Sequence, residues 1–234
     1  MAFLDYRGEC HVHLLILIGV SLIPALLWMW FFRAQDSCEK ERPKTLLVSF
    51  VAGMLAVAPA ILLEEPFRTL METGSTAARI LIAFGVVGLG EEALKLLAVY
   101  WSVYRRPEFN EVVDGMIYSI TAALGFAGVE NLLYTMTFGV RVAPVRALVS
   151  SLAHGAFSGL AGYYLGLARF NYGDVRWMVF RGLCIAALLH GLYNTLLMLK
   201  LISPVGIVIF LLIVYWLVFA ALRKAVSLSP FCSS

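Results

Sequence analysis

Charged residues are scarce in this sequence. Only 14% of its 234 residues are Asp, Glu, Lys or Arg, whereas soluble domains carry about 25%. Hydrophobic residues make up 61%, and the mean hydropathy is +0.86. This composition excludes a soluble globular domain and indicates an integral membrane protein, with the lipid bilayer as one partner. A basic stripe of the kind that binds nucleic acid is also lacking, so we expect neither a nucleic-acid nor a nucleotide partner.

Cysteine is scarce too, and its spacing is uninformative. The four cysteines are Cys10, Cys38, Cys184 and Cys232, and they form no metal-binding spacing. In the topology derived below only Cys10 faces the outside, so we expect no oxidised structural pair.

The apolar runs have the length of membrane-spanning helices, not the alternating ten-residue pattern of a transmembrane barrel. The connections between them are short and contain no repeat or low-complexity linker. We therefore predict an all-α fold, a polytopic transmembrane helical bundle forming a single integral membrane domain over residues 1–234. About seven spans are expected, at residues 12–32, 45–63, 79–104, 112–137, 145–169, 177–199 and 204–222.

Basic residues predict the orientation, because cytoplasmic segments carry an excess of Lys and Arg. With the N-terminus outside and the C-terminus inside, eleven basic residues lie on inner segments and six on outer ones. The inner set is Arg33, Lys40, Arg42, Lys44, Arg105, Arg106, Arg169, Arg176, Arg181, Arg223 and Lys224; the outer set is Arg7, Arg68, Arg79, Arg141, Arg146 and Lys200. The expected location is the plasma (cytoplasmic) membrane.

Three charges lie within the span 79–104. The stretch 88–95 reads Gly-Leu-Gly-Glu-Glu-Ala-Leu-Lys, which contains Glu91, Glu92 and Lys95. A charge at that depth costs at least about 2.5–3.5 kcal/mol. On a helix, the Lys95 ammonium can reach either carboxylate and would keep it ionised, and an ionised, poorly solvated carboxylate is a good general base. A structural ion pair is the alternative, but intramembrane ionisable groups are functional by default.

Further polar residues lie in the other predicted spans. Glu130 is in the fourth span, His154 in the fifth, and His190 and Asn194 share one face of the sixth at a spacing of four. Judged by depth, these residues and the glutamate pair can converge on one cavity open to the outer side. Asp114 lies about 24 Å along the fourth helix from Glu130, so we expect it to cap or pair near the inner surface.

Small residues predict close helix contacts. Gly155, Gly159, Gly162 and Gly166 form a ridge on the fifth span, and Gly125 lies in the fourth. Such residues let helix backbones approach one another in a membrane. We interpret them as packing sites.

Carboxylates and imidazoles in a wet cavity suit water activation. In a metal-free version, Glu91 or Glu92 takes a proton from water while histidine and Asn194 stabilise the oxyanion. In a metal-assisted version, His154, His190 and a glutamate such as Glu130 hold Zn²⁺ and a second glutamate is the base. The His-Glu-x-x-His helix of common zinc proteases is absent, so the cofactor is either none or one divalent metal such as Zn²⁺.

The polar motifs resemble those of the PrsW family of intramembrane proteases. The stretch 91–95 resembles its Glu-Glu-x-x-Lys motif, and Asp114-Gly115, running on to Glu130-Asn131, resembles its second signature. His154 and His190-x-x-x-Asn194 resemble its two histidine motifs. The resemblance covers residues 88–195, and the family is related to the type II CAAX-prenyl and bacteriocin-processing glutamic proteases.

This resemblance implies a peptidase, glutamic or metallopeptidase in type, that cleaves a membrane-anchored protein such as an anti-sigma factor on its extracytoplasmic side. Its catalytic residues would be Glu91, Glu92, Glu130, His154, His190 and Asn194, with Lys95 tuning the charge. The alternative is a proton- or ion-coupled transporter, which also needs carboxylates and histidines at the midplane. Against a transporter, the sequence has no internal repeat.

Overall fold

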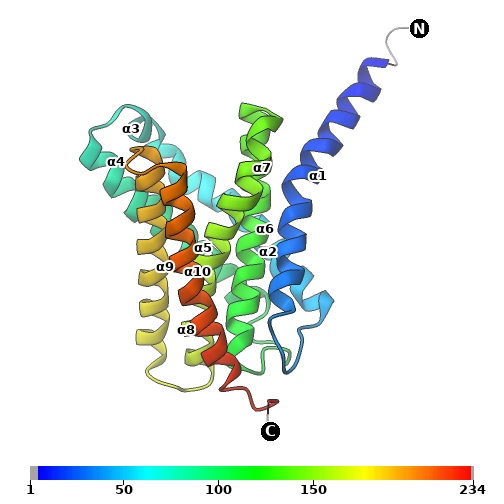
Figure 1. Cartoon of the computed structure of the whole chain (residues 1–234), viewed down its shortest axis with the longest axis vertical. Coiled ribbons are helices and arrows are strands. Elements are labelled where there is room, and N and C mark those ends of the chain that lie inside the picture. The colour runs from blue at the N-terminus through cyan, green and yellow to red at the C-terminus, as the bar shows by residue number, and fades with distance from the viewer. Residues whose placement is uncertain (1–4, 233–234) are drawn as a thin grey trace.

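Every regular element in the described part of the chain is a helix, which confirms the all-α prediction (Figure 1). The structure is a computed structural model that describes the backbone of residues 5–232 and the side chains of residues 15–232. Cys10 and Arg7, which entered the topology argument, lie outside the described side chains.

The elements follow one another with short connections. They are α1 (Asp5–Arg33), α2 (Pro43–Glu64), η1 (Glu65–Phe67), α3 (Arg68–Thr73), α4 (Thr76–Ile82), η2 (Ala83–Gly88), α5 (Leu89–Ser102), α6 (Val112–Phe138), η3 (Val140–Val142), α7 (Ala143–Val145), η4 (Arg146–Ser150), α8 (Ser151–Arg169), α9 (Val175–Met198) and α10 (Pro204–Val226). Of the short elements, η2 and η4 are π-helical.

Five of the described helices are long and apolar enough to cross a membrane by length and composition, namely α1, α2, α6, α9 and α10. The other two predicted spans, 79–104 and 145–169, coincide with helical stretches that a π-helical turn interrupts, α4–η2–α5 and α7–η4–α8. The membrane-embedded helical bundle is thus confirmed, while the number of seven spans and the orientation stay predictions.

The central helix is α6. Of the apolar window that marks it as a candidate span, 94% is buried, and it packs against α1, α2 and α8. At its N-terminus, Asp114 Oδ2 accepts the backbone N–H groups of Asn110 and Glu111 at 2.6 and 2.8 Å, so the predicted capping role of Asp114 is confirmed. The helix ends at Gly139, whose φ of 86° lies in the left-handed region that favours glycine.

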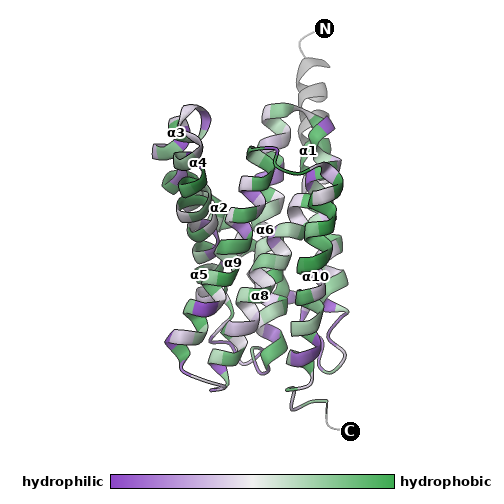
Figure 2. Cartoon of the chain, turned by 60° about the vertical axis from the view of Figure 1, so that its left-hand side comes forward, coloured by the Kyte–Doolittle hydropathy of each residue, from purple (hydrophilic) through white to green (hydrophobic). Residues whose placement is uncertain are grey.

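The outer surface of the bundle is apolar. Large exposed side chains include Leu27, Leu55, Leu62 and Trp216. An apolar exterior of this kind suits contact with the hydrocarbon core of a lipid bilayer. Figure 2 shows this hydrophobic face along α10, with hydrophilic residues at the lower ends of α5 and α10.

Glycines bring the helices around α6 into backbone contact. A methyl group at Gly162 would overlap the carbonyl oxygen of Gly115, and one at Gly125 would overlap that of Phe50. The predicted packing role is therefore confirmed at Gly162 and Gly125. At Gly155, by contrast, an added methyl group would meet its nearest neighbour at an ordinary 3.6 Å.

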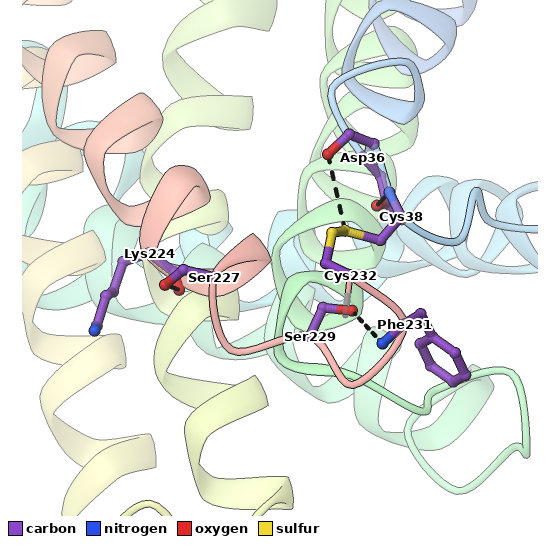
Figure 3. Close-up of a disulfide and its surroundings, with 8 residues drawn as sticks. Asp36, Cys38, Lys224, Ser227, Ser229, Phe231 and Cys232 are labelled. Atoms are coloured by element: carbon purple, nitrogen blue, oxygen red, sulfur yellow. Dashed lines mark hydrogen bonds between the residues drawn. A yellow bond between two sulfur atoms is a disulfide. The ribbon is translucent and has the colours of Figure 1, made fainter. Parts of the chain in front are cut away.

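The expectation that the cysteines stay unpaired is wrong. Cys38, in the α1–α2 connection, and Cys232, in the C-terminal tail, form a disulfide with their Cα atoms 5.1 Å apart (Figure 3). The expectation rested on the redox state of the predicted compartment and took no account of distance. The fold brings together two cysteines that are separated by 194 residues. Cys184 is free.

The glycine contacts generate a stability prediction. Gly125→Ala should lower the melting temperature of the detergent-solubilised protein, because overpacking a closely packed site costs about 1–3 kcal/mol. Gly155→Ala is the matched control, since its added methyl group meets only ordinary contacts, and it should leave the melting temperature within the range of the wild type. Equal melting temperatures for the two variants would contradict the α2–α6 contact.

Candidate active site

A cavity of about 390 Å³ lies among α2, α5, α6, α8 and α9. Five of the six residues predicted to be catalytic line it, namely Glu91, Glu130, His154, His190 and Asn194. Residues from four different predicted spans therefore meet in one place. Glu92, the sixth, does not line the cavity and lies behind it.

The cavity continues toward the α3 and α4 end of the molecule. A second cavity of about 400 Å³ shares Glu64, Met71, Tyr134 and other lining residues with the first, and its rim carries the exposed Arg68. This end lies opposite the C-terminus (Figure 1). The site thus has a passage toward the face that the basic residues assign to the outside.

Lys95 is the centre of the polar cluster. Its ammonium donates to Glu91 Oε2 at 3.0 Å, to Glu92 Oε1 at 2.9 Å and to His154 Nδ1 at 2.7 Å. It also lies 4.3 Å from the ring centroid of Phe126, a cation–π contact. Lys95 is only 1% exposed, so these partners replace the water that a buried ammonium loses. The predicted pairing with both glutamates is present.

Glu92 is held by three neighbours. Besides Lys95, Ser158 Oγ donates to its Oε2 at 2.6 Å, and His190 Nδ1 lies 2.9 Å from its Oε1. Both carboxylate oxygens are therefore engaged inside the protein. Ser158 is not among the residues predicted to be catalytic, and the structure gives it a role as a hydrogen-bond donor to Glu92.

Glu91 faces the cavity. The hydrogen bond it accepts comes from Lys95, and its Oε2 lies 3.8 Å from His154 Nδ1 and 4.0 Å from His190 Nε2. Adjacent residues on a helix point about 100° apart, which is why one glutamate lines the cavity while its neighbour is enclosed.

Glu130 forms a second charged group on the cavity wall. Its Oε2 lies 2.9 Å from His154 Nε2, and its Oε1 lies 3.0 Å from Arg146 Nη2. Arg146 also donates from Nε to Asn131 Oδ1 at 2.9 Å and lies 3.6 Å from the ring centroid of Tyr134.

The hydrogen-bond partners fix the proton positions on the two histidines. An ammonium can only donate, so Nδ1 of His154 accepts from Lys95, and the ring proton of neutral His154 is on Nε2, facing Glu130. An ionised carboxylate can only accept, so Nδ1 of His190 donates to Glu92. Nε2 of His190 faces the Glu91 side of the cavity, 4.0 Å from Glu91 Oε2.

Two π-helical turns form part of the cavity wall. Ala83 and Val87 of η2 and Arg146 and Ser150 of η4 line the cavity. A π-helical turn adds a residue to the helical repeat and re-aims the side chains that follow, and such turns are frequent at functional sites. The turn η2 comes directly before α5, which carries the glutamate pair in its first turn, and η4 comes directly before α8, which carries the first histidine.

Close backbone contact brings α9 to this wall. A methyl group at Gly88 would lie 2.7 Å from the carbonyl oxygen of Ala187 and 3.0 Å from the backbone nitrogen of Gly191. Glycine at these positions lets the two helices touch, which places His190 beside Glu92. The ring of Phe157 packs 5.6 Å from the His190 ring.

Comparison with known proteins identifies the family. The family model described as "PrsW family intramembrane metalloprotease" matches residues 41–222. The chain belongs to the PrsW family of intramembrane proteases.

Curated PrsW relatives support the same assignment. Protease PrsW of Geobacillus kaustophilus is 34% identical over 89% of this chain and 90% of its own length. Protease PrsW of Halalkalibacterium halodurans is 30% identical over 89% and 96%, and that of Bacillus subtilis is 32% identical over 77% and 82%. No solved structure matches the chain. The PrsW chain is thus an integral membrane peptidase, in keeping with the bacterial cytoplasmic membrane, and the transporter alternative is not favoured.

Sequence reasoning missed two residues of this PrsW site. Arg146 was counted only as a basic residue of an outer segment, and Glu64 was given no role, yet both line the cavity. Neither falls in a recognisable motif. Their position next to predicted span ends was the only available signal.

A metal ion is one possible occupant of the PrsW site, so we tested the donor set. Glu91, His154 and His190 each offer one ligand atom, and these atoms lie within 4.8 Å of one another. Glu130, which the sequence paired with the histidines, is outside this group. Residue types and spacing suit a three-ligand zinc site, and each histidine directs its other nitrogen to a carboxylate, as metal-ligating histidines do.

The Lys95 ammonium conflicts with such an ion. It lies 2.7 Å from His154 Nδ1 and 3.0 Å from Glu91 Oε2, so a positive charge already occupies the coordination positions of two of the three donors. The donor set fits a metal only if Lys95 withdraws. The arrangement present in the structure does not fit a bound ion.

Proposed function

We propose that this intramembrane protease hydrolyses a peptide bond of a membrane-anchored protein by a metal-free mechanism in which Glu91 activates water. The observation that carries the proposal is the contrast between the two glutamates. Glu92 is enclosed by three hydrogen-bonding partners, whereas Glu91 lines the cavity, where Lys95 and the side chain of Glu64 are its neighbours. A general base must reach the water that it deprotonates, and of the two only Glu91 meets that requirement.

The attacking water would lie between Glu91 and His190. Their facing atoms, Oε2 and Nε2, are 4.0 Å apart, so one water can donate a hydrogen bond of about 2.8 Å to each. Both hydrogens of the water are then engaged, and its oxygen lone pair is left for the substrate carbonyl. Glu92 and Ser158 act as positioning residues, because they hold the His190 ring in the required tautomer.

In the first step, Glu91 takes one proton while the water oxygen forms a bond to the carbonyl carbon. The amide of Asn194, which lines the cavity, would donate to the resulting oxyanion. In the second step the carbon–nitrogen bond breaks, and Glu91 returns the proton to the leaving amine. Glu130 and His154 hold Lys95 in place, and Lys95 keeps Glu91 charged between turnovers.

The family resemblance implies a substrate of the anti-sigma-factor type, cut on its extracytoplasmic side. The passage from the site to the α3 and α4 end supports that direction of entry, because the basic residues predict this end to be outside. The rim of the passage contains the charged side chains Glu65, Arg68 and Glu72. It would therefore admit water together with an extended segment of the substrate.

The roles of the two glutamates can be separated by substitution. Glu91→Gln should fold normally, because Lys95 keeps Glu92 and His154 as partners, and should lose about 10²–10⁴ in cleavage rate, as removal of a general base does. Glu92→Gln should lower the melting temperature, because hydrogen bonds to a charged group contribute about 1.5–3 kcal/mol each. Cleavage of a reconstituted membrane-anchored reporter and thermal unfolding in detergent measure the two effects.

Glu39→Gln is the matched control, since it removes an exposed carboxylate at the far end of the bundle. It should keep both the rate and the melting temperature. A fully active Glu91→Gln enzyme would refute Glu91 as the base. An unfolded Glu91→Gln protein would instead make Glu91 a structural partner of Lys95.

The metal-free mechanism predicts resistance to chelation. Incubating the purified enzyme with 1,10-phenanthroline or EDTA should leave the cleavage rate unchanged, because the base and the oxyanion donor both come from the chain. Elemental analysis of the same preparation should find less than one zinc ion per chain. Loss of activity that added Zn²⁺ restores would refute this mechanism and assign the ion to Glu91, His154 and His190.

The proposed orientation can be measured by cysteine labelling. In a background with the four native cysteines changed to serine, Thr69→Cys on α3 should react with a membrane-impermeant maleimide in intact cells. Tyr172→Cys, in the exposed α8–α9 turn at the opposite end, should react only after permeabilisation. The reverse pattern would place the mouth of the site in the cytoplasm. Retained cleavage activity in both variants serves as the folding control.

A further inference from the structure

A second buried polar cluster lies at the end of the bundle away from the active site. Asp36 and Glu41 belong to the α1–α2 connection, and Asp114 lies in the first turn of α6. The three residues are 0%, 5% and 0% exposed. Each offers one carboxylate oxygen, and these oxygens lie within 4.8 Å of one another. Figure 3 shows Asp36 beside the Cys38–Cys232 disulfide.

Protein groups satisfy only part of this cluster. Asp36 Oδ1 accepts the backbone N–H of Cys38 at 3.0 Å, and Tyr118 donates to Glu41. Glu41 and Asp114 form a side-chain hydrogen bond, which needs a proton on one of the two carboxylates. The other oxygen of Asp36, Oδ2, is buried without a hydrogen-bond partner. Buried polar atoms are rarely left unpaired, so this oxygen points to a missing ligand.

Ion pairs to lysine or arginine are also lacking here, since Arg33 Nε donates to the backbone oxygen of Glu41 at 2.7 Å and not to a carboxylate of the cluster. The ion pairs formed by lysine and arginine side chains in the described part of the chain involve other carboxylates, and none reaches Asp36, Glu41 or Asp114. In the active site, by contrast, Lys95 and Arg146 balance the carboxylates. Three carboxylates so close together must gain protons or a cation to remain buried.

We propose that Asp36, Glu41 and Asp114 bind a divalent cation of the oxygen-preferring class, Ca²⁺ or Mg²⁺. Ca²⁺ binds oxygens at about 2.3–2.6 Å, so its ligands lie at most about 5.2 Å apart, and the three oxygens, all within 4.8 Å of one another, are close enough to share one ion. A cavity of about 100 Å³, lined by Glu41 and by the acidic Glu39 and Glu108, gives a path for the ion and its waters.

The ion would join two parts of the fold. Asp36 follows α1, Glu41 precedes α2, and Asp114 caps the central helix α6 through its other oxygen. A shared proton is the competing state of the same cluster. Burial raises the pKa of Asp36 and of Glu41 above their ordinary values, as desolvation of a carboxylate does, so the cluster binds protons if no cation is present.

Direct binding to the full-length protein tests the proposal. The protein, purified in detergent and stripped with EDTA, is titrated with CaCl₂ or MgCl₂ at pH 7.5 in an isothermal calorimeter, and its melting temperature is recorded with and without each ion. We expect one ion per chain and a rise in melting temperature. Absence of binding by both ions would overturn the proposal and leave the shared proton as the state of the cluster.

Variants locate the bound ion. Asp36→Asn and Asp114→Asn keep the shape and one acceptor oxygen but remove a charge, so each should weaken binding at least tenfold. Glu91→Gln, in the active site, should bind as the wild type does. Unchanged affinity in both asparagine variants would overturn the assignment, and so would loss of binding in Glu91→Gln. If one asparagine variant fails to fold, the other decides the outcome.

Discussion

A buried ammonium fixes the arrangement of the active site. Lys95 is almost fully enclosed in a membrane protein, where an unpaired charge would cost several kcal/mol. The fold therefore surrounds it with Glu91, Glu92 and His154 from two helices. Because an ammonium only donates hydrogen bonds, its contact with His154 also determines which ring nitrogen carries the proton. The contacts of Lys95 thus determine the positions of the two glutamates, the balance of their charges and the tautomer of His154.

Transfer of one proton leaves the net charge of the site unchanged. Glu91, Glu92 and Glu130 pair with Lys95 and Arg146, and Glu64 also lines the cavity. When Glu91 takes a proton from water in the proposed mechanism, its negative charge passes to the oxyanion on the substrate. Contacts to that oxyanion are strong because the site has a low dielectric constant.

The sequence allowed the composition of the site to be predicted, because each of its charged and imidazole groups stands out against an apolar background. The helical register also placed Lys95 within reach of both glutamates. The sequence did not reveal those features of the site that depend on contacts between residues of different helices. The choice between Glu91 and Glu92 required knowing that Ser158 and His190 enclose one of them.

Other features were hidden for the same reason. Arg146 lies at the start of a π-helical turn, and no local sequence rule signals such a turn. The Cys38–Cys232 pair joins chain segments that only the tertiary fold brings together. It also lies at the end where basic residues are frequent, although disulfides persist mainly in oxidising compartments. The positive-inside rule and the disulfide therefore favour opposite orientations in the membrane. The cysteine-labelling experiment on the two ends of the bundle distinguishes between them.

The central helix α6 connects the two polar clusters. It carries Asp114 in its first turn and Glu130 sixteen residues later, about 24 Å away, and every residue from Asp114 to Gly128 is buried. Tyr118 of α6 donates to Glu41 in the α1–α2 connection, while Glu130 meets His154 at the other end of the helix. The ion proposed above would strengthen the first attachment. It would thereby support the geometry of the catalytic end without contacting it.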